Sequence, residues 1–288
     1  MKLDRDVLYK IDLTSSKGNQ LKCKFNERWY KADYLGYEGA AEYLSSFICQ
    51  NSNIEEYVSY SLADIVIPSV EKSFKGCSSA DFLNEGEDLV TADRLLSKFI
   101  SKDFVEKYKK MPLKNAISTF VNDIEQITGI ENFGAKLTQM LELDMLILND
   151  DRHFNNIAFI RDKDGAYRFS PIFDNGGAFL ADTTYDYPLG KNFYGLISNV
   201  KAKPFSADFD KQVEACQDLY GTQLQIDKNI DISEIISKID KVYGSEISKR
   251  MSDVFEHQKF IYSEMFVNKV FDKENSFADL SVDELKID

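Results

Sequence analysis

The sequence is poor in positive charge. It has 35 Lys and Arg residues against 48 Asp and Glu, a formal net charge of -13. This deficit argues against a broad basic surface of the kind that binds nucleic acid or an anionic membrane. We therefore expect neither partner. A ligand that carries phosphate would have to be met by a local positive pocket.

Long apolar runs and cysteine clusters are also missing. No stretch approaches the roughly 18 apolar residues of a membrane-spanning helix, and the opening Met1–Asp6 lacks the apolar core of a signal peptide. The four cysteines lie far apart and form no C-x-x-C pair; they are Cys23, Cys49, Cys77 and Cys216. This pattern favours a reducing cytoplasm over a disulfide or zinc framework, with export as an effector as the alternative.

The clearest pattern that is present is a hairpin in the middle of the chain. Asp162–Gly165 reads D-K-D-G and lies between two apolar runs, which is a strong signal for two antiparallel strands. Asn156 precedes the first strand and Asp174 follows the second, so both lie at one end of the ribbon, whose strands are about 4.8 Å apart. An Asn oxygen and an Asp carboxylate are hard ligands that suit Mg²⁺.

Asp151 lies five residues before Asn156, in a polar loop after an expected helix. A carboxylate there could accept the proton of an attacking hydroxyl. One such base and two metal ligands are the parts that phosphoryl transfer requires. Asp, Asn and Gly are also ordinary turn residues, so a plain acidic loop is the alternative. His153 could equally be a structural hydrogen-bonding residue.

The segments D-R-H-F-N-N at 151–156 and F-D-N-G at 173–176 resemble HipA-like kinases and, more distantly, phosphatidylinositol 3-kinases. The resemblance implies that Asp151 is the catalytic base and that His153 faces the transferring phosphate. It implies Asn156 and Asp174 as Mg²⁺ ligands and ATP as the phosphate donor. Asn175 replaces the Phe of the common D-F-G motif, so regulation by a flipping Phe is not expected.

The N-terminal part of the sequence contains candidate residues for binding phosphate. Residues 6–31 favour two or three strands with a Gly-bearing turn, in which only Gly permits a close approach of backbone to phosphate. The segment G-N-Q-L-K at 18–22 resembles the phosphate-facing G-x-Q-x-K loop of HipA-like kinases; a plain hairpin turn is the alternative. The resemblance implies phosphate contacts from Gly18, Asn19, Gln20 and Lys22.

Lys31 ends an alternating strand and shares a face with Trp29. A strand lysine that anchors ATP phosphates needs a carboxylate from a following helix. The helix expected from Glu38 offers Glu38 and, one turn later, Glu42. We prefer Glu38, which is nearer the helix start, and retain Glu42 as the rival; an ordinary solvated lysine is the alternative. Residues 29–43 resemble a HipA-like subgroup related to the bacterial CtkA kinase.

The remaining elements follow from local patterns. We expect two strands within 54–70, at 56–62 and 64–70, a turn-rich hinge at 76–88 and an irregular, activation-segment-like stretch after Gly177. A helix capped by Thr91 is expected, with further helices at 113–127, 132–148, 209–220, 233–242 and 247–267. Asp144 is a polar residue on an apolar helix face, so it needs donors from the backbone or Arg152.

Together these patterns and the resemblance predict a two-lobed α+β kinase-like fold. Residues 1–82 form a small β-rich N-lobe and residues 83–288 a mostly helical C-lobe. The expected function is ATP- and Mg²⁺-dependent phosphorylation of protein Ser/Thr hydroxyls, and also of the protein's own Thr14, Ser15 or Ser16. A lipid or small-molecule kinase and a non-catalytic nucleotide-binding module are the alternatives.

Overall fold

The structure is a computed structural model that describes residues 20–67, 72–269, 271 and 283–286. Within these ranges, no helix combines the length and the apolar composition needed to cross a membrane. The predictions for Gly18 and Asn19, and those for Thr14, Ser15 and Ser16, lie outside the described residues.

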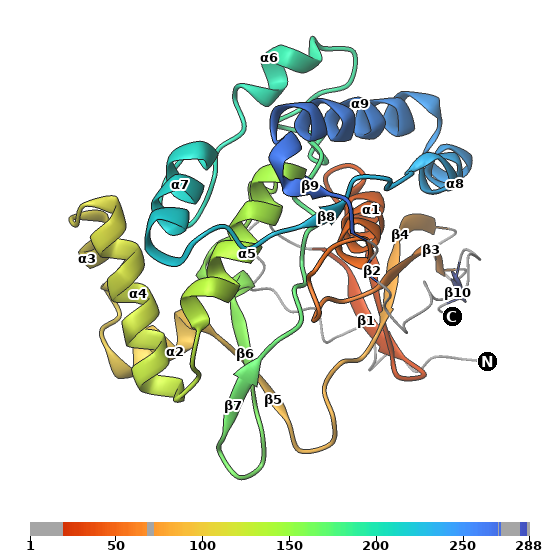
Figure 1. The fold of residues 1–288 in the computed structure, drawn as a ribbon. Helices are drawn as coiled ribbons and strands as arrows, with labels where there is room; N and C mark the ends of the chain where they lie inside the picture. Colours follow the sequence, from red (N-terminus) through yellow and green to blue (C-terminus); the bar gives the residue numbers. More distant parts are fainter. Residues whose placement is uncertain (1–19, 68–71, 270, 272–282, 287–288) are drawn as a thin grey trace.

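One helix packs on a five-stranded sheet (Figure 1). The strands, in spatial order, are β1 (Lys22–Phe25), β2 (Arg28–Ala32), β4 (Lys72–Ala80), β3 (Tyr60–Ile67) and β10 (Asp283–Lys286). All pairings are antiparallel except that of β10 with β3. Helix α1 (Glu38–Gln50) contacts β3 and β4. A Cβ at Gly39 would lie 2.4 Å from the Gly76 carbonyl carbon, so the glycines permit this close packing.

Two sequence predictions for this part are wrong. Residues 54–70 hold one described strand, β3, rather than two, and Tyr57 forms only an isolated bridge to Ile172. The proposed hinge at 76–88 begins too early, because residues 76–80 belong to β4. Gly and Ser favour turns, but here their small size lets β4 lie beside α1. Residues 81–87 connect β4 to the next strand, which begins at Asp88.

The larger part of the molecule is helical. Its helices are α2 (Ala92–Phe99), α3 (Phe104–Lys109), α4 (Leu113–Thr128), α5 (Phe133–Ile147), α6 (Phe193–Ile197), α7 (Phe209–Tyr220), α8 (Ser233–Tyr243) and α9 (Ser245–Ile261). Helix α5 contacts α4, α7 and α9 and is buried along most of its length. The expected helices are confirmed. The last one ends at Ile261 rather than at 267, because β9 (Phe266–Val267) pairs with β8 (Ile226–Asp227).

A three-stranded sheet carries the predicted hairpin (Figure 1). Strands β6 (Ala158–Arg161) and β7 (Tyr167–Phe169) are antiparallel, and β5 (Asp88–Thr91) pairs with the other edge of β6. The turn contains Gly165 at φ 89°, a conformation that suits Gly. Thr91 caps α2 as predicted, accepting a hydrogen bond from the Arg94 backbone N–H at 3.2 Å.

The two-lobed α+β architecture is confirmed, with one correction. Residues 283–286, which we assigned to the C-lobe, form β10 and extend the N-terminal sheet. A parallel pairing between β10 and β3 leaves no signal in local sequence. The lobe boundary near residue 82 stays a prediction.

Candidate active site

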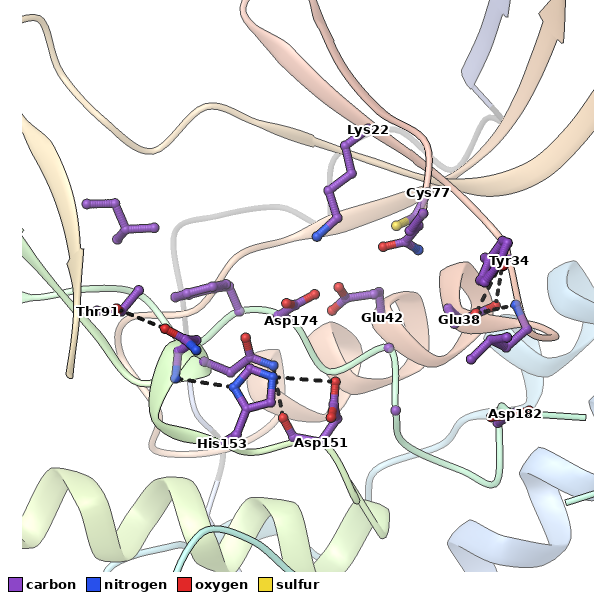
Figure 2. Close-up of a pocket in the computed structure, with 18 of the residues that line it drawn as sticks. Lys22, Tyr34, Glu38, Glu42, Cys77, Thr91, Asp151, His153, Asp174 and Asp182 are labelled. Atoms are coloured by element: carbon purple, nitrogen blue, oxygen red, sulfur yellow. Dashed lines mark hydrogen bonds and ion pairs between the residues drawn. The ribbon is translucent and has the colours of Figure 1, made fainter. Parts of the chain in front are cut away.

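A cleft of about 660 Å³ lies between the N-terminal sheet with α1 and the loop that follows α5 (Figure 2). Its size is that of a small-molecule site. Seven of the residues that the sequence predicted for the site line it: Gln20, Lys22, Glu38, Asp151, His153, Asn156 and Asp174. Segments more than a hundred residues apart in the sequence therefore meet in one cavity.

The loop after α5 is held by the buried guanidinium of Arg152. Its Nε and Nη2 donate to the two oxygens of Asp144 at 2.8 and 3.0 Å, which confirms the predicted partner of that carboxylate. Nη1 donates to the backbone carbonyls of Asn156 and Phe173 at 2.9 and 3.0 Å. Nη2 also donates to the Asn175 side-chain oxygen at 2.5 Å. These five contacts match the five N–H groups of an arginine, and they fix both ends of the hairpin.

The two predicted metal ligands lie at the positions that Arg152 holds. Asn156 ends a 3-10 turn, Phe154–Asn156, and its amide nitrogen donates to the Asp151 carbonyl at 2.9 Å. The amide oxygen, which is the ligand end, remains for a cation. Asp174 follows the second strand with φ at 59°. Burial by itself would raise the pKa of the Asp174 carboxyl, but the charges of Lys31 and Lys22 hold that pKa well below its usual range.

This donor set fits Mg²⁺. Within the part of the chain that the structure describes, no group of three or more His, Cys, Asp or Glu side chains could hold a metal. One amide oxygen and one ionised carboxylate are too few for a closed protein site, but they suffice for Mg²⁺, which completes its shell with water and phosphate.

Lys31 bridges the sheet, α1 and the hairpin. Its ammonium donates to Glu42 Oε1 at 2.7 Å, to Asp174 Oδ1 at 3.0 Å and to the Tyr60 hydroxyl at 3.3 Å. Burial would lower the pKa of Lys31, but Asp174 and Glu42 raise it well above the usual value. The other Glu42 oxygen accepts the Asn175 backbone N–H at 2.8 Å. Lys31 is thus charged and fixed at the Asp174 side of the cleft.

The preference for Glu38 as the partner of Lys31 is wrong. Glu38 is the first residue of α1, and its carboxylate turns back to accept the backbone N–H groups of Leu35 at 2.7 Å and Gly36 at 3.0 Å. These N–H groups belong to the loop that precedes the helix, so the Glu38 carboxylate holds that loop in place. Glu42, one turn further on and only 2% exposed, faces Lys31 instead.

The expected base, Asp151, lies below Asp174 in the view of Figure 2. Its Oδ1 accepts a hydrogen bond from Lys203 Nζ at 3.0 Å, and its Oδ2 lies 3.9 Å from His153 Nε2. Burial lowers the pKa of the His153 imidazole, an effect that Asp151 opposes and Lys203 assists. At neutral pH this histidine is therefore a neutral hydrogen-bonding group beside the carboxylate.

Comparison with known proteins bears on the fold. No family model and no curated protein sequence matches the chain. The solved structure of the Helicobacter pylori proinflammatory kinase CtkA superimposes with a TM-score of 0.60 at 20% identity, covering 89% of this chain and 93% of CtkA. The chain has the CtkA kinase fold. HipA in the HipA, HipB and operator DNA complex of Shewanella oneidensis MR-1 gives a TM-score of 0.43 at 12% identity, covering 90% of this chain and 62% of that one.

The cleft contains residues that the sequence did not reveal. Helix α2 and the strand before it contribute Leu89, Thr91, Asp93 and Arg94. No motif marked them, although the Thr91 cap located the start of the helix. Residue 177 has to be glycine because of a close contact: a Cβ there would lie 2.9 Å from the Asp151 Cβ. The second glycine of D-N-G-G thus allows the hairpin to pass directly beside the expected base.

The corrected pairing predicts unequal effects of two charge-neutralising substitutions. Glu42→Gln removes the carboxylate that holds Lys31 and Asn175, and groups that orient a site residue are typically worth about 10- to 100-fold in activity. Glu38→Gln keeps an oxygen that can accept a backbone N–H, so a loss within about threefold is expected on the same scale. Steady-state turnover of ATP would measure both. Equal losses would contradict the distinction.

Asp33 anchors the start of α1 to the C-lobe side of this CtkA-like fold. Its Oδ1 accepts the Gly39 N–H at 2.6 Å and its Oδ2 the Tyr243 hydroxyl of α8 at 2.8 Å. Burial, together with the nearby Glu38 charge, raises the pKa of Asp33 to about 7. The helix that carries Glu42 is therefore held by a carboxyl that titrates near neutrality.

We expect this carboxyl to make stability depend on pH. Between its ordinary pKa of 3.8 and about 7, the folded protein holds a proton that the unfolded chain releases. Stability from Asp33 is thus present at low pH and is lost as pH rises through this window. Asp33→Asn should be more stable than the parent at pH 8 by roughly 1 to 3 kcal/mol, and indistinguishable from it near pH 4. Urea unfolding at both pH values tests this. Asp253→Asn, the same substitution at an exposed position, is the control.

Proposed function

We propose that this protein is a kinase that uses ATP and Mg²⁺ to phosphorylate protein Ser/Thr hydroxyl groups. The observation that carries the proposal is the cleft lined by Glu42, Asp151, Asn156 and Asp174. Lys31 stands behind this lining and bonds to both Glu42 and Asp174. This set supplies a cation for donor phosphates, two metal ligands and a base. The CtkA fold, itself that of a kinase, is consistent with it.

Each residue has a separate task. Lys31 orients the donor phosphates from the α1 side, and Lys22 reaches toward Asp174 from the strand above (Figure 2). Asn156 and Asp174 would hold Mg²⁺, which supplies charge neutralisation on the phosphates when it is bound. Asp151 orients the acceptor hydroxyl and takes its proton. His153 is the neutral neighbour that donates or accepts a hydrogen bond at the same carboxylate.

A protein acceptor fits the charge of the chain better than a lipid acceptor. A net charge of -13 opposes approach to an anionic membrane surface, where a lipid substrate would lie. Self-phosphorylation at Thr14, Ser15 or Ser16 is part of the proposal, because these hydroxyls directly precede the expected phosphate loop at 18–22. A phosphoryl group there would add about -1.5 to -2 charges beside the ATP phosphates and oppose ATP binding.

Incubation with γ-labelled ATP tests the proposal. The purified protein would be supplied with Mg²⁺ and a cell lysate, and label would be measured in proteins, in lipids and in the enzyme itself. Label in protein Ser/Thr that disappears with Asp151→Asn supports the proposal. Label confined to lipids or small molecules would reassign the acceptor. No consumption of ATP would leave a nucleotide-binding module at most. Mass spectrometry of the enzyme locates any self-phosphorylation.

A further inference from the structure

Lys203 contacts the expected base from a part of the chain that no motif singles out. Its Nζ donates to Asp151 Oδ1 at 3.0 Å, and its side chain is 41% exposed, whereas that of Asp151 is 17% exposed. An ion pair whose lysine is this exposed contributes little to stability. Lys203 therefore adds little to the stability of the fold, and a role toward the substrate has to be considered.

The loop that carries Lys203 is built to hold its backbone in place. The fully buried side chain of Gln212, in α7, donates to the Lys203 carbonyl at 2.9 Å and accepts the N–H groups of Phe205 at 2.9 Å and Ser206 at 3.1 Å. The Phe205 ring packs on Phe154 of the catalytic loop, with centroids 5.6 Å apart. The backbone of Lys203 is thus held in place beside Asp151, whereas its partly exposed side chain can change rotamer.

The two lysines mark opposite sides of the reaction. Lys31 bonds to Asp174, on the side where the donor phosphates would be held, and Lys203 bonds to Asp151, on the side where the acceptor hydroxyl would arrive. The group in transfer has to pass from the first side to the second. Its non-bridging oxygens carry the charge that a positioned cation stabilises best.

We propose that Lys203 is a catalytic residue that binds the phosphoryl group during transfer. In this step the bond from the bridging oxygen to the γ-phosphorus breaks and a bond from the acceptor oxygen to that phosphorus forms. The acceptor proton goes to Asp151, and ADP leaves with the electron pair of the broken bond. The Lys203 ammonium has three N–H donors and gives one to Asp151, so the others can donate to the non-bridging oxygens while the group is in transfer. This inference rests on the proposed kinase function.

Three variants test the role: Lys203→Met removes the charge, Lys203→Arg keeps it, and Lys201→Met is the matched control at an exposed lysine of the same loop. The readout is total release of γ-phosphate from ATP to any acceptor, water included, together with affinity for a non-hydrolysable ATP analogue with Mg²⁺ and the unfolding temperature. We expect Lys203→Met to lower kcat about 100-fold, with analogue affinity and unfolding temperature unchanged. Lys203→Arg should recover part of the loss, and Lys201→Met should match the parent.

The outcomes separate the two proposals. If the parent neither binds the analogue nor consumes ATP, the kinase function falls and this role with it. If the parent is active and Lys203→Met has the same kcat, only the role of Lys203 is overturned. A faster Lys203→Met would also overturn it, because the lysine would then be occupying the place of the acceptor. A loss matched by weaker analogue binding would assign Lys203 to ATP binding instead.

Discussion

Asp174→Ala is expected to weaken Mg²⁺-dependent binding of a non-hydrolysable ATP analogue by about 100-fold or more, since a metal ion on a phosphoryl oxygen is worth several kcal/mol. Asp151→Ala should bind the analogue nearly as well as the parent and yet lose turnover. The difference follows from position. Asp174 is the ionised carboxylate beside Lys31, on the side proposed for the donor phosphates. Asp151 lies beside Lys203 and His153, on the side proposed for the acceptor hydroxyl.

Calorimetry with and without Mg²⁺ measures this. Asp174→Asn is the closest control, because it keeps the shape of the side chain and an oxygen for Lys31 but removes the charge; it should lose most of the Mg²⁺ dependence too. Titration of the parent in chelator fixes the metal-free reference. Equal affinity of Asp174→Ala, Asp151→Ala and the parent would refute the metal assignment, whatever the activities.

Arg152→Met is expected to cost roughly 3 to 5 kcal/mol of unfolding free energy, as does loss of one partner of a buried ion pair. Arg152 and Asp144 are both 0% exposed, so the substitution leaves a buried carboxylate without its cation. It also frees the Asn156 and Phe173 carbonyls, which set the two ends of the hairpin. Activity should therefore fall even where the variant is still folded.

Urea unfolding checks the prediction against two further variants. Arg161→Met breaks an exposed pair with Asp88 and should cost far less unfolding free energy than Arg152→Met. Arg152→Met combined with Asp144→Leu removes both buried charges, so it should be more stable than Arg152→Met alone. If the two single arginine variants were destabilised equally, the buried network would not be what holds the loop that follows α5.

Local patterns were enough for much of this protein. The β6–β7 hairpin, the Thr91 cap and the helix that starts at Glu38 depend on neighbours within a few residues, and all three were predicted. The Asp144 to Arg152 pair was also predictable, because a carboxyl on an apolar helix face must find a donor nearby. Because Asp151, Asn156 and Asp174 flank one hairpin, the sequence predicted that they lie close together. In the structure all three line one cleft.

What only the tertiary structure decided are contacts between distant segments. Glu38 bonds to backbone N–H groups two and three residues before it, which is a local contact. That Glu42 faces Lys31, however, follows from how α1 packs on β3 and β4. Lys203 bonds to Asp151, 52 residues away in the sequence. Strand β10 pairs with β3, although more than 200 residues separate them. Which distant residues meet depends on packing and charge in the folded protein. Hydrophobic periodicity and turn residues describe only local structure, so they do not predict these contacts.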